Sequence, residues 1–283
     1  MRVKELVAKF LEKVEARRSV NTYRFYAGRL ALLVREVGAK KVKDLKAKHI
    51  ERFLATVNHW KDGSPKAPDT IRANIVAFEQ LQKFSIRIGL LSAPLLDELP
   101  KPVGRMRERL PTEDEVAAIK LHANRAFGLI YQALRLCGAR PNELARATVA
   151  HWDRDSRQIV LTEHKTAWKT GAARKIAVGE RLEALILQSL GERTAGLLFV
   201  TARGKAWTPA TLSASFRRAR NAAELDKRLV LYSARHEHGT AVYRLAGELA
   251  AATALGHTGT GMLRRYAHIS PAERCKTQDQ IGI

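Results

Sequence analysis

Three residues near the end of the chain have side chains suited to chemistry on a phosphate group. Arg235 stands in the run Tyr-Ser-Ala-Arg-His, His257 follows a Leu-Gly pair, and Tyr266 comes nine residues later. A guanidinium binds phosphate oxygens, an imidazole donates a hydrogen bond, and a phenol can act as a nucleophile. Each residue alone is more often structural, as an amphipathic tyrosine or a histidine at a helix cap. The three therefore need partners from elsewhere in the chain.

Two earlier segments hold candidate partners. Arg140 precedes Pro141, which is suited to a first helical position, so we expect Arg140 near a helix N-terminus that favours anions. An ordinary surface pair of Arg140 with Glu143 is an equal alternative. A turn further on contains Lys165 and Lys169, each followed by threonine. A lysine on a hairpin turn can reach an active site, although such a residue is more often only solvated.

The composition indicates a polyanionic partner. The 283 residues include 50 Lys and Arg against 28 Asp and Glu, a net charge of +22. Residues 1–110 hold 24 basic against 12 acidic residues, and residues 111–283 hold 26 against 16, so both halves are basic. The simplest such partner is nucleic acid, bound largely through its phosphates. A merely soluble basic surface is the alternative.

The two cysteines and the apolar runs indicate the compartment. Cys137 and Cys275 have neither a metal-like spacing nor a disulfide framework, which is typical of a reducing cytoplasm. The start of the chain lacks an apolar signal region, and no apolar run approaches the ~20 residues that span a bilayer. We therefore expect a cytoplasmic, nucleoid-associated protein with no membrane partner.

Apolar residues at helical spacing predict a helical first half with no strand before residue 100. The helices are expected at 3–16, at 19–37 with Ser19 as the cap, at 44–57, and at 69–88 with Asp69 as the cap. A lysine run lies between the second and third of these, at Lys40, Lys41, Lys43, Lys46 and Lys48. We interpret it as a contact with a DNA backbone, the alternative being a solvated helix face.

The second half changes period and predicts an α+β domain. Prolines and arginines in 93–111 indicate a basic linker between domains at 1–92 and 112–283. Thr112 and Glu115 form a capping box. Helices are expected at about 126–136, 180–190, 210–223 and 272–281, and short β-type runs at 148–152, 158–162 and 174–178. The predicted fold is mostly α with a small antiparallel β-sheet, arranged as a two-domain DNA clamp.

In this order, the motifs resemble those of the tyrosine recombinase (phage integrase) family over nearly the whole chain. The first 90 residues are similar to its helical core-binding domain. The runs that correspond to its boxes are Cys-Gly-Ala-Arg140-Pro-Asn-Glu143, His-Lys165-Thr, Tyr232-Ser-Ala-Arg235-His236, Leu-Gly-His257 and Tyr266. One residue departs from the pattern: Tyr232 stands where the family usually has histidine, and a phenol is a poorer base than an imidazole at neutral pH.

The resemblance implies roles for these residues. Tyr266 would attack a DNA phosphodiester and form a 3′-phosphotyrosyl link, so that rejoining needs no ATP. Arg140 and Arg235 would bind the non-bridging oxygens, and His257 would hydrogen-bond the phosphate. Lys165, with Lys169 as the alternative, would protonate the leaving oxygen. Tyr232 would take a supporting position, and no metal or cofactor is expected.

The resemblance also implies the partners. These are a double-stranded DNA recombination site, further copies of the chain in a DNA-bound tetramer, and, as an additional class, accessory DNA-bending proteins. Within enzymes, the alternative is a telomere resolvase or a type IB topoisomerase-like strand transferase. Outside enzymes, the alternative is a DNA-binding regulator that lacks catalysis. The target DNA sequence and the biological role are not encoded in these motifs.

Overall fold

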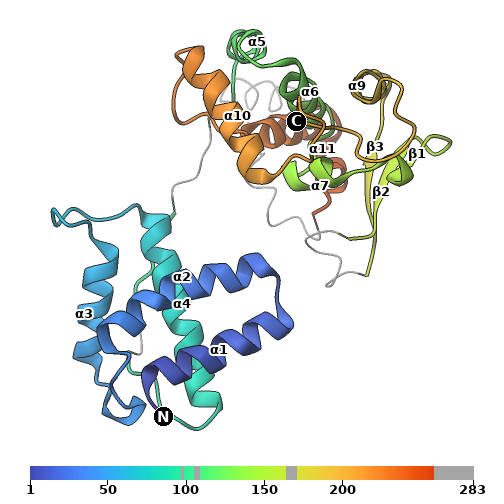
Figure 1. Ribbon diagram of the computed structural model, residues 1–283. Helices are drawn as coiled ribbons and strands as arrows, with labels where there is room; N and C mark the ends of the chain where they lie inside the picture. Colours follow the sequence, from blue (N-terminus) through green and yellow to red (C-terminus); the bar gives the residue numbers. More distant parts are fainter. Residues whose placement is uncertain (97–98, 105–108, 164–170, 258–283) are drawn as a thin grey trace, which may run out of the picture. The chain divides into compact units, whose positions relative to one another are not determined.

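The chain forms two compact units in the computed structural model, which describes residues 1–96, 99–104, 109–163 and 171–257 (Figure 1). Contacts divide the chain between Met106 and Arg107, inside the stretch 93–111 that the sequence predicts as a linker. Each unit has its own cluster of buried apolar residues. The separate functions assigned to the two parts stay a prediction.

The first unit is built from helices around one apolar core. Their bounds are α1 (Val3–Arg17), α2 (Val20–Val37), α3 (Ala47–Asn58) and α4 (Pro68–Arg87), with a 3₁₀ turn η1 (Val42–Asp44). All four α-helices supply buried residues to this core. In the described residues before position 100, isolated bridges such as Arg2 to Lys41 occur, but no strand does, in agreement with the sequence.

Local signals explain where these helices begin. Ser19 is the predicted cap of α2, and its hydroxyl accepts a hydrogen bond from the Thr22 amide at 3.3 Å. The third helix begins at Ala47 and not near Asp44, because residues 42–44 form the 3₁₀ turn η1, which buries Val42 in the core. Asp69 is not the cap of α4: Pro68 occupies the first helical position, where its fixed φ starts the helix earlier.

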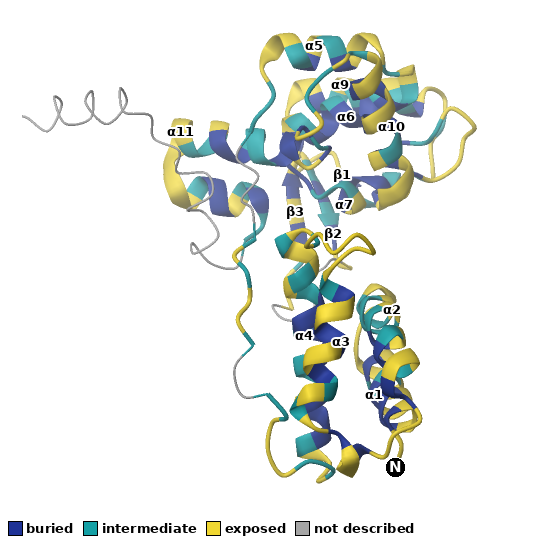
Figure 2. Cartoon of the chain, turned by 90° about the vertical axis from the view of Figure 1, so that its left-hand side faces the viewer, coloured by how far each residue is buried: buried dark blue, intermediate teal, exposed yellow. Residues whose placement is uncertain are grey.

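The second unit combines helices with a small sheet. The helices are α5 (Glu113–Leu121), α6 (Arg125–Cys137), α7 (Pro141–Arg146), α9 (Glu180–Leu190), α10 (Pro209–Ala222) and α11 (Ser233–Leu255). Helix α6 is central: it packs against α7, α9, α10 and α11, and its core side is dark blue in Figure 2. Its end at Gly138, in the left-handed region at φ 58°, is as predicted.

The sheet is antiparallel in the order β1–β2–β3, with bounds β1 (Trp152–Asp153), β2 (Gln158–Leu161) and β3 (Arg174–Ala177). The predicted strand 148–152 is wrong over most of its length, because Val149–His151 form a 3₁₀ turn that the Thr148 amide closes on His151 Nδ1. The fold is mostly α with a small antiparallel sheet, which confirms the predicted class. The helix expected at 272–281 lies outside the described residues.

Helix α11 is interrupted. Gly247 has φ 79° and ψ −174°, so the backbone leaves the helical region there and the segment 248–255 starts afresh. Positive φ of this kind is readily adopted by glycine alone. None of the helices in the described part of the chain is long and apolar enough to cross a membrane.

Candidate active site

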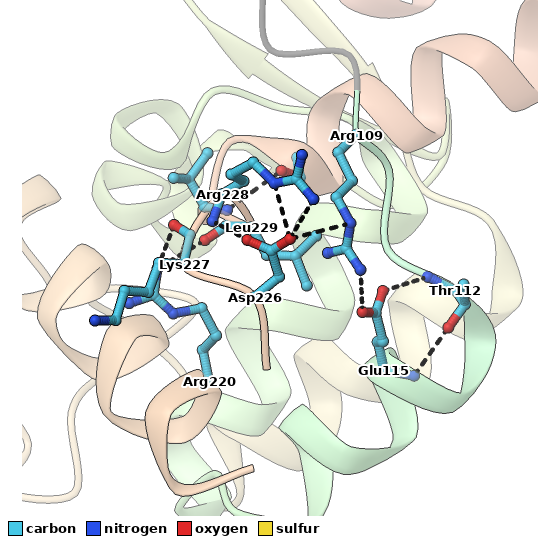
Figure 3. Close-up of polar contacts among 10 residues, drawn as sticks. Arg109, Thr112, Glu115, Arg220, Asp226, Lys227, Arg228 and Leu229 are labelled. Carbon is cyan, nitrogen blue, oxygen red and sulfur yellow. Dashed lines mark hydrogen bonds and ion pairs between the residues drawn. The ribbon is translucent and has the colours of Figure 1, made fainter. Parts of the chain in front are cut away.

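The loop that leads into α11 is held by polar contacts (Figure 3). The buried Arg220 donates Nη1 to the carbonyls of Lys227 at 2.8 Å and Leu229 at 3.0 Å. Hydrogen bonds from the Arg228 side chain and amide lower the pKa of Asp226 to about 2, and Arg109 lies 3.7 Å from the same carboxylate. These contacts fix the point from which α11, and with it Arg235, begins.

Arg235 lies in the centre of the site and joins two helix ends. Its side chain points inward from α11 and only 1% of the residue is exposed. Nη1 donates to the Gly138 carbonyl at 2.5 Å, and Nη2 donates to the Leu255 carbonyl at 2.6 Å. Gly138 must be glycine here, since a Cβ would lie 2.4 Å from the His238 ring. Arg235 thus holds the end of α6 against the end of α11.

Arg140 lies two residues after that contact, at the start of α7, as the sequence predicts. Its Nη1 donates to Glu143 Oε1 at 2.6 Å, and its amide donates to Oε2 at 2.9 Å. Burial opposes ionisation of Glu143, but the hydrogen bonds and charge of Arg140 and the charge of Arg174 hold its pKa below the usual value. The Arg140–Glu143 pair is therefore a largely buried ion pair and not the exposed surface pair of the alternative.

A third arginine, Arg174 at the start of β3, joins this group and was not singled out from the sequence. Its Nε lies 3.7 Å from Glu143 Oε2, and both side chains are buried. Burial lowers the pKa of Arg174, Glu143 opposes this shift, and the positive charge of Arg235 adds to it. One sequence signal could have identified it. In the strand Arg174-Lys-Ile176-Ala, alternation places Arg174 on the same face as the apolar Ile176, and this face is the buried one.

His257 is positioned by the turn that ends α11. Gly256 adopts φ 60°, and the amides of Gly256 and His257 bond back to Thr253 O at 3.0 Å and Ala252 O at 2.9 Å, a Schellman arrangement. The ring nitrogen Nε2 of His257 lies 3.2 Å from Arg235 Nη2. Because a guanidinium only donates, Nε2 accepts in this arrangement.

Of the remaining predicted site residues, the structure describes Tyr232 alone, and Tyr232 is not part of this group. Tyr232 lies at the start of α11 with 40% of its area exposed, and its ring packs edge-on to His236 at 5.2 Å. In the described ranges, its hydroxyl makes no hydrogen bond with Arg140, Arg235 or His257. Lys165 and Tyr266, together with the alternative Lys169, lie outside the described residues.

The described site is strongly basic. The guanidinium groups of Arg140 and Arg174 lie on Glu143, and the charge of Arg235 acts on Arg174, so positive charge exceeds negative charge. Such a group of planar forks suits an oxyanion with several acceptor oxygens. Across the described part of the chain, no group of three or more His, Cys, Asp or Glu side chains is placed to hold a metal ion.

Comparison with solved structures shows the same fold in integrases bound to DNA. A lambda integrase (75–356) dimer bound to a COC′ core site has 16% identity and a TM-score of 0.78, over 94% of this chain and 95% of that one. A lambda integrase tetramer bound to a Holliday junction has 14% identity and a TM-score of 0.76, over 92% and 79%. The Tn1549 transposon integrase (82–397) in complex with circular intermediate DNA has 17% identity and a TM-score of 0.74, over 98% and 99%.

Sequence comparison assigns the family. A search of curated proteins gives no significant match. The phage integrase family, in contrast, matches residues 110–273, which is more than half of the chain and includes the segments of Arg140, Arg235 and His257. This chain belongs to the phage integrase family, the tyrosine recombinases.

Proposed function

We propose that this chain is a site-specific DNA recombinase that cuts and rejoins strands through a 3′-phosphotyrosyl intermediate on Tyr266, without ATP or a metal ion. One observation carries the proposal. The ends of α6 and α11 and the start of α7 bring Arg140, Arg235 and His257 into one basic group, although these residues are far apart in the sequence. Such a group supports chemistry on a phosphodiester.

The two arginines bind and stabilise the reacting phosphate. Charge builds up on the non-bridging oxygens as the phosphate becomes five-coordinate, and donors held in place beforehand stabilise it most. Arg235 is held by two carbonyls, and Arg140 by Glu143, so neither guanidinium needs to reorganise. His257 adds a hydrogen bond beside Arg235. The positions of these groups support phosphate binding without a metal.

The covalent step conserves the phosphodiester energy. The Tyr266 phenol gives its proton to solvent and its oxygen forms a bond to phosphorus, while the bond from phosphorus to the 5′ oxygen breaks. Lys165 gives a proton to the leaving 5′ oxygen as general acid. In rejoining, a 5′-hydroxyl gives its proton to Lys165 and attacks the phosphotyrosyl phosphorus, the bond from phosphorus to the Tyr266 oxygen breaks, and that oxygen takes up a proton from solvent. Tyr232 takes a supporting position at the start of α11.

Double-stranded DNA is the proposed partner, and a tetramer the proposed working assembly. The net charge of +22 supports phosphate-rich DNA as the ligand. The lambda integrase of the same fold is bound to a core site as a dimer and to a Holliday junction as a tetramer, which supports a similar assembly here. Accessory DNA-bending proteins remain a further proposed class of partner.

The test begins by finding a DNA site. The Tyr266→Phe variant, which should bind but not cut, selects duplexes from a randomised pool. A nicked suicide version of the selected duplex then traps any covalent adduct, because the fragment beyond the nick diffuses away. Wild type should give a phenol-stable protein–DNA adduct, whereas Tyr266→Phe should give none and still shift the duplex.

Other outcomes decide between functions. Adducts that persist in Tyr266→Phe contradict the assignment of the nucleophile. Plasmid relaxation without exchange between two selected sites favours a topoisomerase-like activity, and hairpin products favour a telomere resolvase. A mobility shift with no strand breakage by wild type favours a DNA-binding regulator.

A further inference from the structure

We propose that Arg174 is a positioning residue of this site: it fixes the last turn of α11 on strand β3, and through that turn it places His257 and the carbonyl that holds Arg235. The inference rests on the proposed recombinase function for its catalytic consequence, but its structural part stands on the contacts of Arg174 alone.

The Arg174 guanidinium donates hydrogen bonds to backbone carbonyls at the end of α11. Its Nη1 donates to the Thr253 carbonyl at 3.3 Å, and its Nη2 donates to the Ala254 carbonyl at 2.6 Å. Nη1 also donates to the Lys175 carbonyl of its own strand at 2.8 Å. The guanidinium therefore ties β3 directly to the two carbonyls that precede Leu255.

The side chain also fills the space beside the final turn. A Cβ on Gly256 would lie 2.8 Å from Arg174 Cδ and 2.9 Å from Nε. Gly256 thus lacks a side chain for two reasons, its positive φ and the close approach of Arg174. The residue after this glycine is His257, so the packing of Arg174 sets where that imidazole leaves the helix.

Polar anchors such as Arg174 and Arg235 matter for the end of α11 because its buried apolar cluster is small in the described part of the chain. The break at Gly247 separates the segment 248–255 from the part of the helix that contains Arg235. Its buried residues, Ala251, Ala252 and Leu255, form a small cluster apart from the main core of the unit. Alanines bury little apolar area, so hydrophobic packing alone restrains this segment poorly.

Electrostatics favour arginine at this position. The last carbonyls of a helix lack partners within it and form the negative end of its dipole, which attracts cations. Arg174 meets two of these carbonyls and places Nε 3.7 Å from Glu143. One planar guanidinium can contact both carbonyls and the Glu143 carboxylate at once, whereas a lysine ammonium is too compact to reach all three.

Arg174 is not placed to bind the phosphate itself. Its two Nη groups donate to three carbonyls and its Nε faces the Glu143 carboxylate, so each nitrogen of the guanidinium is already directed at an acceptor within the protein. We therefore expect it to act through the turn at Gly256 and His257. Its strand follows the segment that contains Lys165 in the sequence, which gives a competing explanation that the experiment must separate.

The experiment compares Arg174→Met, which keeps the length and apolar stem, with Arg174→Lys, which also keeps the charge. Arg193 offers a matched control: it donates to the carbonyl of Ser189, in the last turn of α9, at 2.8 Å and to that of Leu197, beyond the helix, at 2.7 Å. Arg193→Met removes a guanidinium that makes similar carbonyl contacts in the same unit, at a place away from the site.

The first measurement is independent of activity. Hydrogen exchange in Arg174→Met should be about tenfold faster at the amides of Gly256 and His257, since the turn loses its anchor. Arg193→Met should leave these two amides unchanged. Unchanged exchange there in Arg174→Met overturns the proposal, whatever the catalytic result.

The second measurement uses the suicide duplex selected with Tyr266→Phe. Arg174→Met should shift the duplex as wild type does but form adduct at least ~100-fold more slowly, as expected when transition-state donors are displaced. Arg174→Lys should recover part of this loss, and Arg193→Met should match wild type. An equal loss in Arg193→Met would mean general destabilisation and overturn the proposal.

A duplex with sulfur in place of the scissile 5′ oxygen separates the two routes. A thiolate leaves without protonation, so this substrate should relieve Lys165→Ala but not Arg174→Met. Full relief of Arg174→Met would show that Arg174 acts through the lysine and overturn the route through α11. If wild type forms no adduct at all, the recombinase proposal fails and the exchange measurement alone decides the role of Arg174.

Discussion

Arg174 and Arg235 share the last carbonyl groups of α11 between them. Arg174 donates hydrogen bonds to the carbonyls of Thr253 and Ala254, and Arg235 donates one to the carbonyl of Leu255. One arginine comes from a strand and the other from an earlier part of the same helix. The turn that presents His257 is therefore held by two buried guanidinium groups, and its geometry depends on side chains that lie outside the turn.

Gly256→Ala should destabilise the protein through this relationship. The substitution forces a Cβ at positive φ and against Arg174 Cδ, so we expect a loss of about 2 kcal/mol in unfolding free energy. Urea denaturation measures it. Gly204→Ala is the control, because Gly204 has φ 69° with nothing within 4 Å and should lose only the backbone contribution.

Adding Arg174→Met to Gly256→Ala tests whether the two residues meet. If the clash is real, the loss in the double variant should be smaller than the sum of the two single losses. Strict additivity would contradict the close packing of Gly256 on Arg174.

Glu143→Gln should lower stability in a way that depends on pH. The folded protein holds the pKa of Glu143 below its usual value, so the folded state binds this proton less tightly than the unfolded state. The stabilisation is present above the unfolded-state pKa of ~4.3 and is lost as the pH falls through the folded-state pKa. At pH 7 we expect Glu143→Gln to cost about 2 kcal/mol, because it leaves Arg140 and Arg174 without a charged partner.

Urea unfolding of wild type and Glu143→Gln at pH 7, 5 and 3.5 measures this dependence. The difference between the two proteins should be the same at pH 7 and 5 and smaller at pH 3.5. A difference that stays constant to pH 3.5 would mean that the carboxylate charge contributes nothing.

Tyr232→His should form adduct faster than wild type on the selected suicide duplex. An imidazole exchanges protons near neutral pH, which a phenol does not, and the half-exposed position can accept the smaller ring without a clash. Tyr232→Phe, which keeps the edge-on contact with His236 and removes only the hydroxyl, is the matched control. A complete loss of adduct in Tyr232→His with full activity in Tyr232→Phe would assign the ring, and not the hydroxyl, a specific role.

Sequence patterns predicted the elements better than the contacts between them. The caps at Ser19 and Thr112 and the stop at Gly138 follow from local rules, and the structure has them. The role of Arg174 could not be predicted in this way, since its acceptors on α11 lie 79 and 80 residues further on and are backbone carbonyls with no sequence signature. The first strand was overextended for a similar reason: the hydrogen bond from Thr148 to His151 closes a turn that a β-type run does not reveal.

The lysine run of the first unit should contribute binding energy without specificity. Lys40, Lys41, Lys43, Lys46 and Lys48 are all exposed, while Val42 and Leu45 between them are buried and fix the backbone. Replacing Lys43 with Ala should weaken the selected duplex and an unrelated duplex by the same factor. The slope of log Kobs against log salt concentration should become less steep by about 1 if the lysine contacts one phosphate.

Lys120→Ala, at an exposed position of the acidic helix α5, is the control and should leave the slope unchanged. Equal slopes for Lys43→Ala and wild type would favour the alternative that the run is a solvated face.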